Sequence, residues 1–421
     1  MRNSGFLWII ISILALLDIY VYQAIKVVTP TSSPRLRLAI IIIYWTLSIL
    51  VLATLIALPY INFDALPKAV RTYLFAIVVS IFFAKLIACI FFAIDDLRRG
   101  GMWLIGKLFS NPSVEISQSP EGITRSAFLS WLGLGFGSTF FGTMIYGFSN
   151  KYRYQLNRIN LAFNNLPASF KGMKIVHISD IHSGSFMDKQ AVLLGVEKIL
   201  NEQPDLILFT GDMVNDHAHE MNGYMDVFSR LTAPLGVYST MGNHDYGEYA
   251  LPRGLTAEQR KQKVAANVLQ LKQVHQDLGW RLLMNEHVII EKGGESIAIL
   301  GVENWSRKGN FPKYGKMEKA YPGSAGQPFK ILLSHDPSHW DGEIRTLYKD
   351  IDLMLSGHTH GMQFGVELPG FKWSPVQYMY KQWAGLYEVD NQKLYINRGF
   401  GFIGYPGRVG ILPEITVIEL S

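Results

Sequence analysis

The chain has 421 residues, which is enough for two or three structural units. Its composition is 49% hydrophobic and 17% charged, which is too apolar for an ordinary soluble protein and excludes a disordered chain. The formal net charge of +5 comes from the first 150 residues, which hold 11 of the 39 Lys+Arg and 6 of the 34 Asp+Glu. The rest of the chain is balanced, so no basic nucleic-acid-binding face is expected.

Four apolar stretches in the first 150 residues are each long enough to cross a bilayer as a helix, which takes about 20 residues. They cover about 6–28, 36–58, 72–94 and 127–148. We expect a transmembrane module over 1–150, a linker over 151–171 and a catalytic domain over 172–421. Asp18 and Lys85 fall inside predicted spans, where a charge marks a functional or bundle-facing position.

Lys and Arg in the short loops indicate the orientation of these helices. Seven lie in the loops at about 26–37 and 95–126, against three at the N-terminus and in the 61–71 loop. This count favours both ends of the module outside the cytoplasm. Adding Lys151, Arg153 and Arg158 to the outer side brings the counts to seven and six, which weakens the preference.

From Met173 the pattern changes to short β-rich runs. They are Met173–Ser179, Asp205–Thr210, Gly236–Met241, Ser296–Val302, Phe329–Ser334 and Ile351–Ser356. Amphipathic stretches at Lys189–Asn201 and Thr256–Leu278 separate several of them. This alternation predicts a layered α/β domain, in which functional residues follow the strand ends.

Metal-ligand residue types follow five of the predicted strands. They are Asp180 and His182, Asp212, Asn243 with His244 and Asp245, His335, and His358 with His360. A single Asp or His after a strand is more often a helix cap or a satisfied polar residue. Five sets in succession indicate a metal centre instead. Asp212 is the natural bridge between two divalent ions held about 3.5–4 Å apart.

The order DxH, GD, GNHD, H and GHTH resembles that of the calcineurin-like metallophosphoesterase superfamily over about residues 172–421. The fuller strings HISDIHSG, TGDMV, GNHDYG, LLSHDP and SGHTHG look most like its membrane-associated bacterial branch, with phosphodiesterases of the YkuE and YaeI type. The resemblance implies a four-layer αββα sandwich. It also implies hydrolysis of a phosphoester or pyrophosphate bond by in-line attack of metal-bound hydroxide.

The resemblance further implies two divalent metal ions, and mixed oxygen and nitrogen ligands admit Mn, Fe, Zn or Co. Asp180, His182, Asp212 and His360 would hold one ion, and Asp212, Asn243, His335 and His358 the other. His244 would protonate the leaving group, and Asp245 would orient His244 by a hydrogen bond. Arg398 could contact a substrate phosphate or form an ion pair.

Large aromatic residues between the GHTH string and Tyr387 indicate what the enzyme acts on. They are Phe364, Phe371, Trp373, Tyr378, Tyr380 and Trp383. Aromatic residues concentrate at bilayer interfaces, so we favour a lipid-linked substrate over another phosphorylated small molecule. An ordinary lid packed on the sheet would explain the same residues. We expect a multi-pass protein of a bacterial inner or plasma membrane, with its catalytic domain on the extracytoplasmic side.

Two alternatives remain open. A hydrolase of the UDP-2,3-diacylglucosamine type would use the same dimetal centre on the cytoplasmic face to split a nucleotide-sugar pyrophosphate. A membrane sensor or scaffold would only bind phosphoesters, although the complete ligand set and His244 favour catalysis. The sequence identifies neither the metals nor the oligomeric state.

Overall fold

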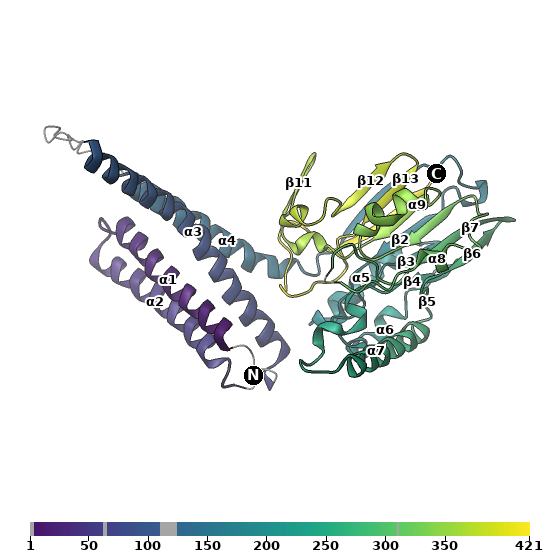
Figure 1. Ribbon diagram of the computed structural model, residues 1–421, viewed down its shortest axis with the longest axis horizontal. Helices are drawn as coiled ribbons and strands as arrows, with labels where there is room; N and C mark the ends of the chain where they lie inside the picture. Colours follow the sequence, from purple (N-terminus) through teal and green to yellow (C-terminus); the bar gives the residue numbers. More distant parts are fainter. Residues whose placement is uncertain (1–3, 62–64, 110–123, 310) are drawn as a thin grey trace. The chain divides into compact units, whose positions relative to one another are not determined.

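The computed structural model describes residues 4–61, 65–109, 124–309 and 311–421. The chain divides into two units, Met1–Tyr146 and Gly147–Ser421, and Figure 1 shows helices in the first and mainly sheets in the second. Arg2 is one of the three cations counted at the N-terminus and in the 61–71 loop, and it is not among the described residues.

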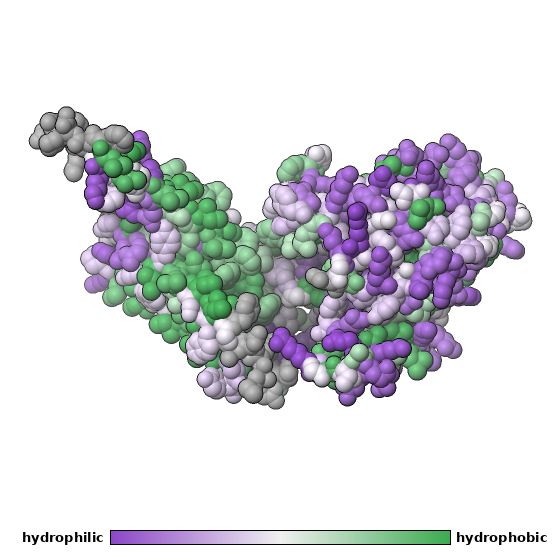
Figure 2. All heavy atoms as spheres, in the orientation of Figure 1, coloured by the Kyte–Doolittle hydropathy of each residue, from purple (hydrophilic) through white to green (hydrophobic). Residues whose placement is uncertain are grey.

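The described part of the first unit consists mainly of four helices. They are α1 (Ser4–Val28), α2 (Pro34–Ala57), α3 (Lys68–Phe109) and α4 (Arg125–Gly147). Each contains a segment long and apolar enough to cross a membrane. The side of this unit drawn in Figure 2 is largely hydrophobic, as surfaces in contact with lipid chains must be. The chain is therefore a multi-pass membrane protein, as predicted.

The third helix differs from its prediction, because it continues well beyond residue 94. α3 has 42 residues, which at 1.5 Å per residue is about 60 Å, or roughly twice the hydrocarbon core of a bilayer. The charges that ended the predicted span support the helix instead. Asp95 forms ion pairs with Arg98 at 2.8 Å and with Arg99 at 3.3 Å, at spacings that stabilise a helix.

A buried polar cluster joins three of these helices. Asp18 of α1 is completely buried and forms an ion pair with Lys85 of α3. Ser48 of α2 donates a hydrogen bond to Asp18 Oδ1 at 2.6 Å, and Tyr44 of α2 donates to the Asp18 carbonyl at 2.7 Å. Both intramembrane charges therefore face the helix bundle, which agrees with the bundle-facing alternative.

Asp18→Leu should destabilise this unit, because it leaves the Lys85 ammonium buried without its counter-charge. Removing one partner of a buried ion pair costs about 3–5 kcal/mol. Thermal unfolding of the detergent-purified chain measures the loss, and the double variant Asp18→Leu/Lys85→Leu should recover much of it. Lys107→Leu removes an exposed cation from α3, the helix that carries Lys85, and serves as the control. A double variant no more stable than Asp18→Leu would contradict the interpretation.

Within the described residues, the second unit contains two six-stranded sheets. The first has the order β1 (Gln155–Leu161), β14 (Glu414–Leu420), β2 (Lys174–Ile178), β3 (Leu206–Phe209), β4 (Val237–Ser239) and β5 (Arg281–Leu282). The second has the order β12 (Gly385–Val389), β13 (Gln392–Ile396), β9 (Leu353–Ser356), β8 (Lys330–Leu333), β7 (Glu295–Gly301) and β6 (Glu286–Lys292). The helices are α5 (Lys189–Asn201), α6 (Met225–Phe228), α7 (Ala257–Asp277), α8 (Met317–Ala320) and α9 (Arg345–Leu347).

Alternating strand side chains build the four layers. In β3, Leu206 and Leu208 belong to the core between the sheets, whereas Ile207 and Phe209 belong to the core beneath α5 and α7. In β8, Leu332 faces away from the first sheet and packs with Trp340. Since successive side chains of a strand point to opposite faces, each sheet separates two cores. This confirms the predicted αββα sandwich.

The segment 151–171, expected as a linker, contains β1. This strand pairs in parallel with β14, from Gln155 opposite Glu414 to Leu161 opposite Leu420. β1 is an edge strand whose residues are mostly exposed or half-buried. Its apolar signal is therefore too weak to distinguish it from a polar connection.

The pairing of the central strands brings their carboxyl ends together. β2, β3 and β4 are parallel neighbours, with Ile178 opposite Phe209 and Phe209 opposite Ser239. β8 and β9 are parallel in the other sheet, with Leu333 opposite Leu355. The loops that follow these strands consequently leave each sheet at one edge, where α/β folds place their sites.

Candidate metal centre

The predicted ligands lie in the loops after five of these strands. Asp180 and His182 follow β2, Asp212 follows β3, Asn243 follows β4, His335 follows β8, and His358 and His360 follow β9. The structure brings side chains from these loops of both sheets together in two groups.

Several of these residues have a left-handed backbone. Their φ angles are +54° at Asp180, +47° at His182, +59° at Asp212, +70° at His358 and +50° at His360. Such a conformation costs a non-glycine residue about 1–2 kcal/mol. Hydrogen bonds from Asp180 N to Gly211 O at 2.9 Å and from His182 N to Asp212 O at 3.1 Å help to hold it. Strain that the surrounding structure enforces in this way concentrates at functional sites.

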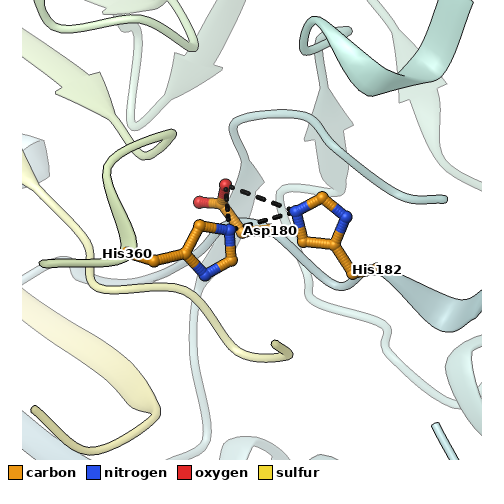
Figure 3. A group of neighbouring side chains, drawn as sticks. All are labelled: Asp180, His182 and His360. Carbon is orange, nitrogen blue, oxygen red and sulfur yellow. Dashed lines mark hydrogen bonds and ion pairs between the residues drawn. The ribbon is translucent and has the colours of Figure 1, made fainter. Parts of the chain in front are cut away.

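The first group consists of Asp180, His182 and His360, whose ligand atoms all lie within 4.8 Å of one another (Figure 3). The Nε2 atoms of His182 and His360 are 3.0 Å apart. Asp180 Oδ1 lies 3.1 Å from His360 Nε2 and 4.0 Å from His182 Nε2. All three side chains are buried, so their ligand atoms converge away from bulk water.

The second group consists of Asp212, His335 and His358, and its ligand atoms also lie within 4.8 Å of one another. His335 Nε2 is 3.0 Å from Asp212 Oδ2, while His335 Nδ1 is 2.7 Å from the carbonyl of Thr210 and is held by it. His358 Nδ1 is 2.7 Å from Asn243 Oδ1. Asn243 therefore adds an amide oxygen beside the group.

Asp212 lies between the two groups. Its Oδ2 is 3.0 Å from His335 Nε2 in the second group and 3.6 Å from His182 Nε2 in the first. Its Oδ1 accepts the backbone N–H of His244 at 2.8 Å, which fixes the carboxylate plane. One oxygen thus faces imidazoles of both groups, as a bridging ligand must.

The electrostatics of the centre favour cations. Burial opposes ionisation of Asp180, yet the imidazoles of His360 and His335 hold its pKa well below the usual value. Burial opposes ionisation of Asp212 as well, but its pKa is lowered, chiefly by His335 and His244. Burial in turn lowers the pKa of His335, but Asp212 and Asp180 raise it to about 10. Two ionised carboxylates therefore draw positive charge into the centre.

The residues fit two divalent metal ions. Two carboxylates, four imidazoles and one amide converge, and this mixture suits Mn, Fe, Zn or Co. Glycine at positions 242 and 357 also leaves room for the carboxylates. A Cβ atom at Gly242 would collide with Asp212, and one at Gly357 would collide with Asp180. The two His/Asp groups are thus consistent with a dimetal centre.

His244 stands beside the centre, but Asp245 does not orient it as predicted. His244 is half-buried, and its Nδ1 lies 2.7 Å from the carbonyl of Asn215. Asp245 points inward and accepts backbone N–H groups of Gly242, Asp212 and Met213, each at 2.8 Å. The short helical turn that begins at His244 sends these neighbouring side chains in different directions. Asp245 therefore holds the loop of Asp212, and a backbone carbonyl holds His244.

Two residues that the sequence prediction missed hold His358. The phenol of Tyr380 is 2.8 Å from His358 Nε2 and donates a hydrogen bond to Asp336 Oδ2 at 3.2 Å. Asp336 Oδ2 is itself 3.6 Å from His358 Nε2. Partners of this kind fix the orientation of a metal-binding imidazole. Asp336 directly follows His335, which was a usable signal, whereas Tyr380 stood out only as one of several aromatic residues.

Arg408 is a third missed residue, and nothing in its sequence surroundings singled it out. Its guanidinium is completely buried and donates hydrogen bonds to the carbonyls of Arg398 at 2.7 Å and of His360 and Gly399 at 3.2 Å. Nη2 also lies 3.3 Å from His360 Nδ1. Arg408 therefore supports the backbone that carries His360.

The remaining candidates lie outside the two groups. Arg398 forms a buried ion pair with Glu414 and a second ion pair with the exposed Glu367, so its guanidinium is already neutralised. His177 contacts Thr210, and burial lowers its pKa to about 4. The other histidines outside the centre are His217, His219, His275, His287 and His339.

A cavity of about 240 Å³ opens onto the centre. Its polar lining comprises His182, Asp212, Asn243, His244, His358, Thr359 and His360. Its apolar lining comprises Phe311, Met362, Val376, Met379 and Ile403, and the amphipathic Tyr380 completes it. A larger hollow of about 500 Å³ between α7 and β5 lies away from the metal-ligand groups. The lining of the cavity that serves the centre thus combines metal-ligand side chains with apolar ones.

Two family models match the chain, one for each unit. Residues 173–362 match the calcineurin-like phosphoesterases. These residues therefore form a calcineurin-like phosphoesterase domain. Residues 1–151 match the transmembrane domain of probable calcineurin-like phosphoesterases. The chain therefore combines a transmembrane domain of this kind with a metallophosphoesterase domain.

Curated proteins similar to this chain are named as metallophosphoesterases or phosphodiesterases. The chain is 29% identical over 261 residues to the metallophosphoesterase YkuE of Bacillus subtilis, covering 61% of this chain and 82% of the relative. It is 28% identical to the phosphodiesterase YaeI of Escherichia coli, covering 63% and 88%. It is 27% identical to a zebrafish transmembrane protein with a metallophosphoesterase domain, covering 62% of this chain but 56% of the relative.

Asp212→Asn should lower the metal content of the purified chain, because an amide cannot supply the negatively charged bridge between two cations. After purification with Mn²⁺, elemental analysis should find close to two ions in the native chain and at least one fewer in the variant. Asp277→Asn changes an exposed carboxylate on α7 and should leave the content unchanged. Equal metal content in all three proteins would contradict the bridging role.

Proposed function

We propose that this membrane protein hydrolyses a phosphoester or pyrophosphate bond of a lipid-linked substrate. The observation that carries the proposal is the cavity, because its lining combines the metal-ligand residues His182, Asp212 and His358 with apolar side chains such as Met362, Met379 and Ile403. Phosphate has the charge to bind beside cations, and an acyl or prenyl chain suits apolar walls.

The proposed ligands divide into two sets that share Asp212. One ion would be held by Asp180, His182, Asp212 and His360, and the other by Asp212, Asn243, His335 and His358. When bound, the ions would polarise the phosphoryl oxygens and supply a water-derived nucleophile at neutral pH. The protein fixes the geometry, since Asp245 holds the Asp212 loop and Tyr380 and Asp336 hold His358.

His244 is the proposed general acid. The carbonyl of Asn215 accepts a hydrogen bond from the Nδ1–H of His244, which leaves Nε2 for the substrate. The side chain is half-buried and lines the cavity, so a leaving-group oxygen can reach it. Proton transfer from the imidazolium would neutralise the alkoxide as the phosphorus–oxygen bond breaks.

His244→Asn should lower turnover of an alkyl phosphodiester by about 10²–10⁴-fold, the usual contribution of general acid catalysis. Turnover of a nitrophenyl phosphodiester should fall much less, because nitrophenolate leaves without protonation. Steady-state kinetics on both substrates measures the difference. His287→Asn replaces a histidine outside the centre and should affect neither substrate. Equal losses on both substrates in His244→Asn would refute the acid role.

The proposed location is a bacterial inner or plasma membrane with the catalytic unit on the extracytoplasmic side. The support is the excess of Lys and Arg in the predicted inner loops. A UDP-2,3-diacylglucosamine-type substrate would require the cytoplasmic side, since UDP-sugars are made there. Labelling of a cysteine introduced at exposed Asp277 with a membrane-impermeant maleimide in intact cells distinguishes the two sides.

The function is tested with the detergent-purified full-length chain and added Mn²⁺. Phosphate or nucleotide release is compared for a nitrophenyl diester, a monoester, a lipid phosphate, a lipid pyrophosphate and UDP-2,3-diacylglucosamine. We expect turnover of a lipid-linked compound that Asp212→Asn abolishes. Turnover of soluble esters alone would replace the lipid-linked proposal with a soluble diester. A metal-loaded chain inactive on every compound would support a binding role instead.

A further inference from the structure

The strongest feature outside the metal centre is a small hairpin that projects from the second unit (Figure 1). β10 (Val366–Leu368) pairs antiparallel with β11 (Phe371–Trp373), and within the described chain the pair forms its own two-stranded sheet. Its apolar side chains are unusually open to solvent, with exposed fractions of 61% at Leu368 and 57% at Phe371. The ion pair of Glu367 with Arg398 and the hydrogen bond from Lys372 Nζ to the Ala384 carbonyl hold the hairpin to the unit, while these apolar side chains stay uncovered.

Further apolar side chains lie in the adjoining segments. The group comprises Met362, Val366, Leu368, Phe371, Tyr378 and Met379, and we refer to it as the apolar rim. The described part of the second unit exposes 13 large apolar side chains, and these six fall within 18 consecutive residues. A cluster of this kind marks an interaction surface, whereas single exposed apolar residues need no explanation.

The rim adjoins the point where the chain leaves its fourth membrane helix. Arg408 N donates a hydrogen bond to the carbonyl of Gly147, the last residue of α4, at 2.9 Å. The next residue, Val409, donates to Gln363 O at 2.8 Å and accepts from Gly365 N at 2.9 Å. Since the candidate span runs to Asn150, only a short path of hydrogen bonds separates the membrane end of the chain from the first residues of the rim.

The charges near the rim suit a bilayer surface. Lys372 and Lys381 are exposed, and Lys308 is anchored by a hydrogen bond of 2.7 Å from its ammonium to the Met379 carbonyl. Glu367, the one acidic residue between 362 and 381, is paired with Arg398. Apolar side chains flanked by lysines bind at the boundary between headgroups and acyl chains, and more strongly when the lipids are anionic.

We propose that the apolar rim inserts into the interfacial layer of the same bilayer that α4 spans. Met362 and Met379 belong both to the rim and to the cavity lining. Insertion therefore places these two residues of the cavity lining against lipid, where a lipid-linked substrate could enter sideways without crossing water. The docking itself depends on exposure and tethering, and does not require the catalytic proposal to hold.

The test places a fluorophore in the hairpin of the full-length chain. The single cysteine is removed by Cys89→Ala, Leu368→Cys is labelled with an environment-sensitive dye, and the protein is reconstituted in phosphatidylethanolamine and phosphatidylglycerol nanodiscs containing doxyl-phosphatidylcholine. Leu347→Cys is the matched control, since Leu347 is an exposed apolar residue on α9 outside the rim. We expect doxyl lipid to quench the dye severalfold more strongly at position 368 than at position 347.

A second variant separates insertion from mere proximity. Phe371→Glu in the protein labelled at position 368 should reduce quenching toward the value at position 347, because a carboxylate resists entry into the bilayer. Leu269→Glu, an exposed position on α7, should leave it unchanged. Equal quenching at 368 and 347 would overturn the proposal. A blue-shifted emission at 368 that is insensitive to doxyl lipid would also overturn it, and would identify a second copy of the chain as the occupant.

Discussion

The position of one carboxylate, that of Asp212, is the constraint on which the centre depends. Its Oδ2 lies near imidazoles from both sheets, and its Oδ1 is tied to the backbone of His244. Asp245 holds the same loop from beneath by accepting its N–H groups. Burial of two acids would ordinarily be costly, but the facing histidines offset it, and bound cations would add to this compensation.

The fold makes this arrangement possible by packing two sheets face to face, so that loops from both sheets meet at the metal-ligand groups. The parallel strands β2, β3 and β4 deliver ligands from one sheet, and β8 and β9 deliver them from the other. Each loop then turns sharply through left-handed residues such as Asp180 and His360. Burial of the hydrophobic core between the sheets contributes far more free energy than the left-handed backbone of these residues costs. The folded core can therefore hold the turns in place.

Sequence reasoning succeeded where residue type and strand periodicity determine position. His182 and Asp212 could be placed near each other because the parallel strands that precede them, β2 and β3, end at a common edge of one sheet. It failed where side-chain direction decides the contact, as for Asp245, whose neighbour His244 turns the other way. It also failed for Tyr380, because its contact with His358 depends on how a loop folds back over the sheet.

The edge strand β1 has a practical consequence for work on the isolated catalytic unit. A fragment cut at residue 172 would lack β1 and leave β14 with an open edge, whose unpaired amides and carbonyls invite strand addition by other molecules. It would also remove the Gly147 carbonyl that accepts the N–H of Arg408, the residue whose guanidinium braces the His360 loop. A soluble fragment that begins at Gly147 keeps both the sheet edge and the brace, and is the better starting point for crystallisation.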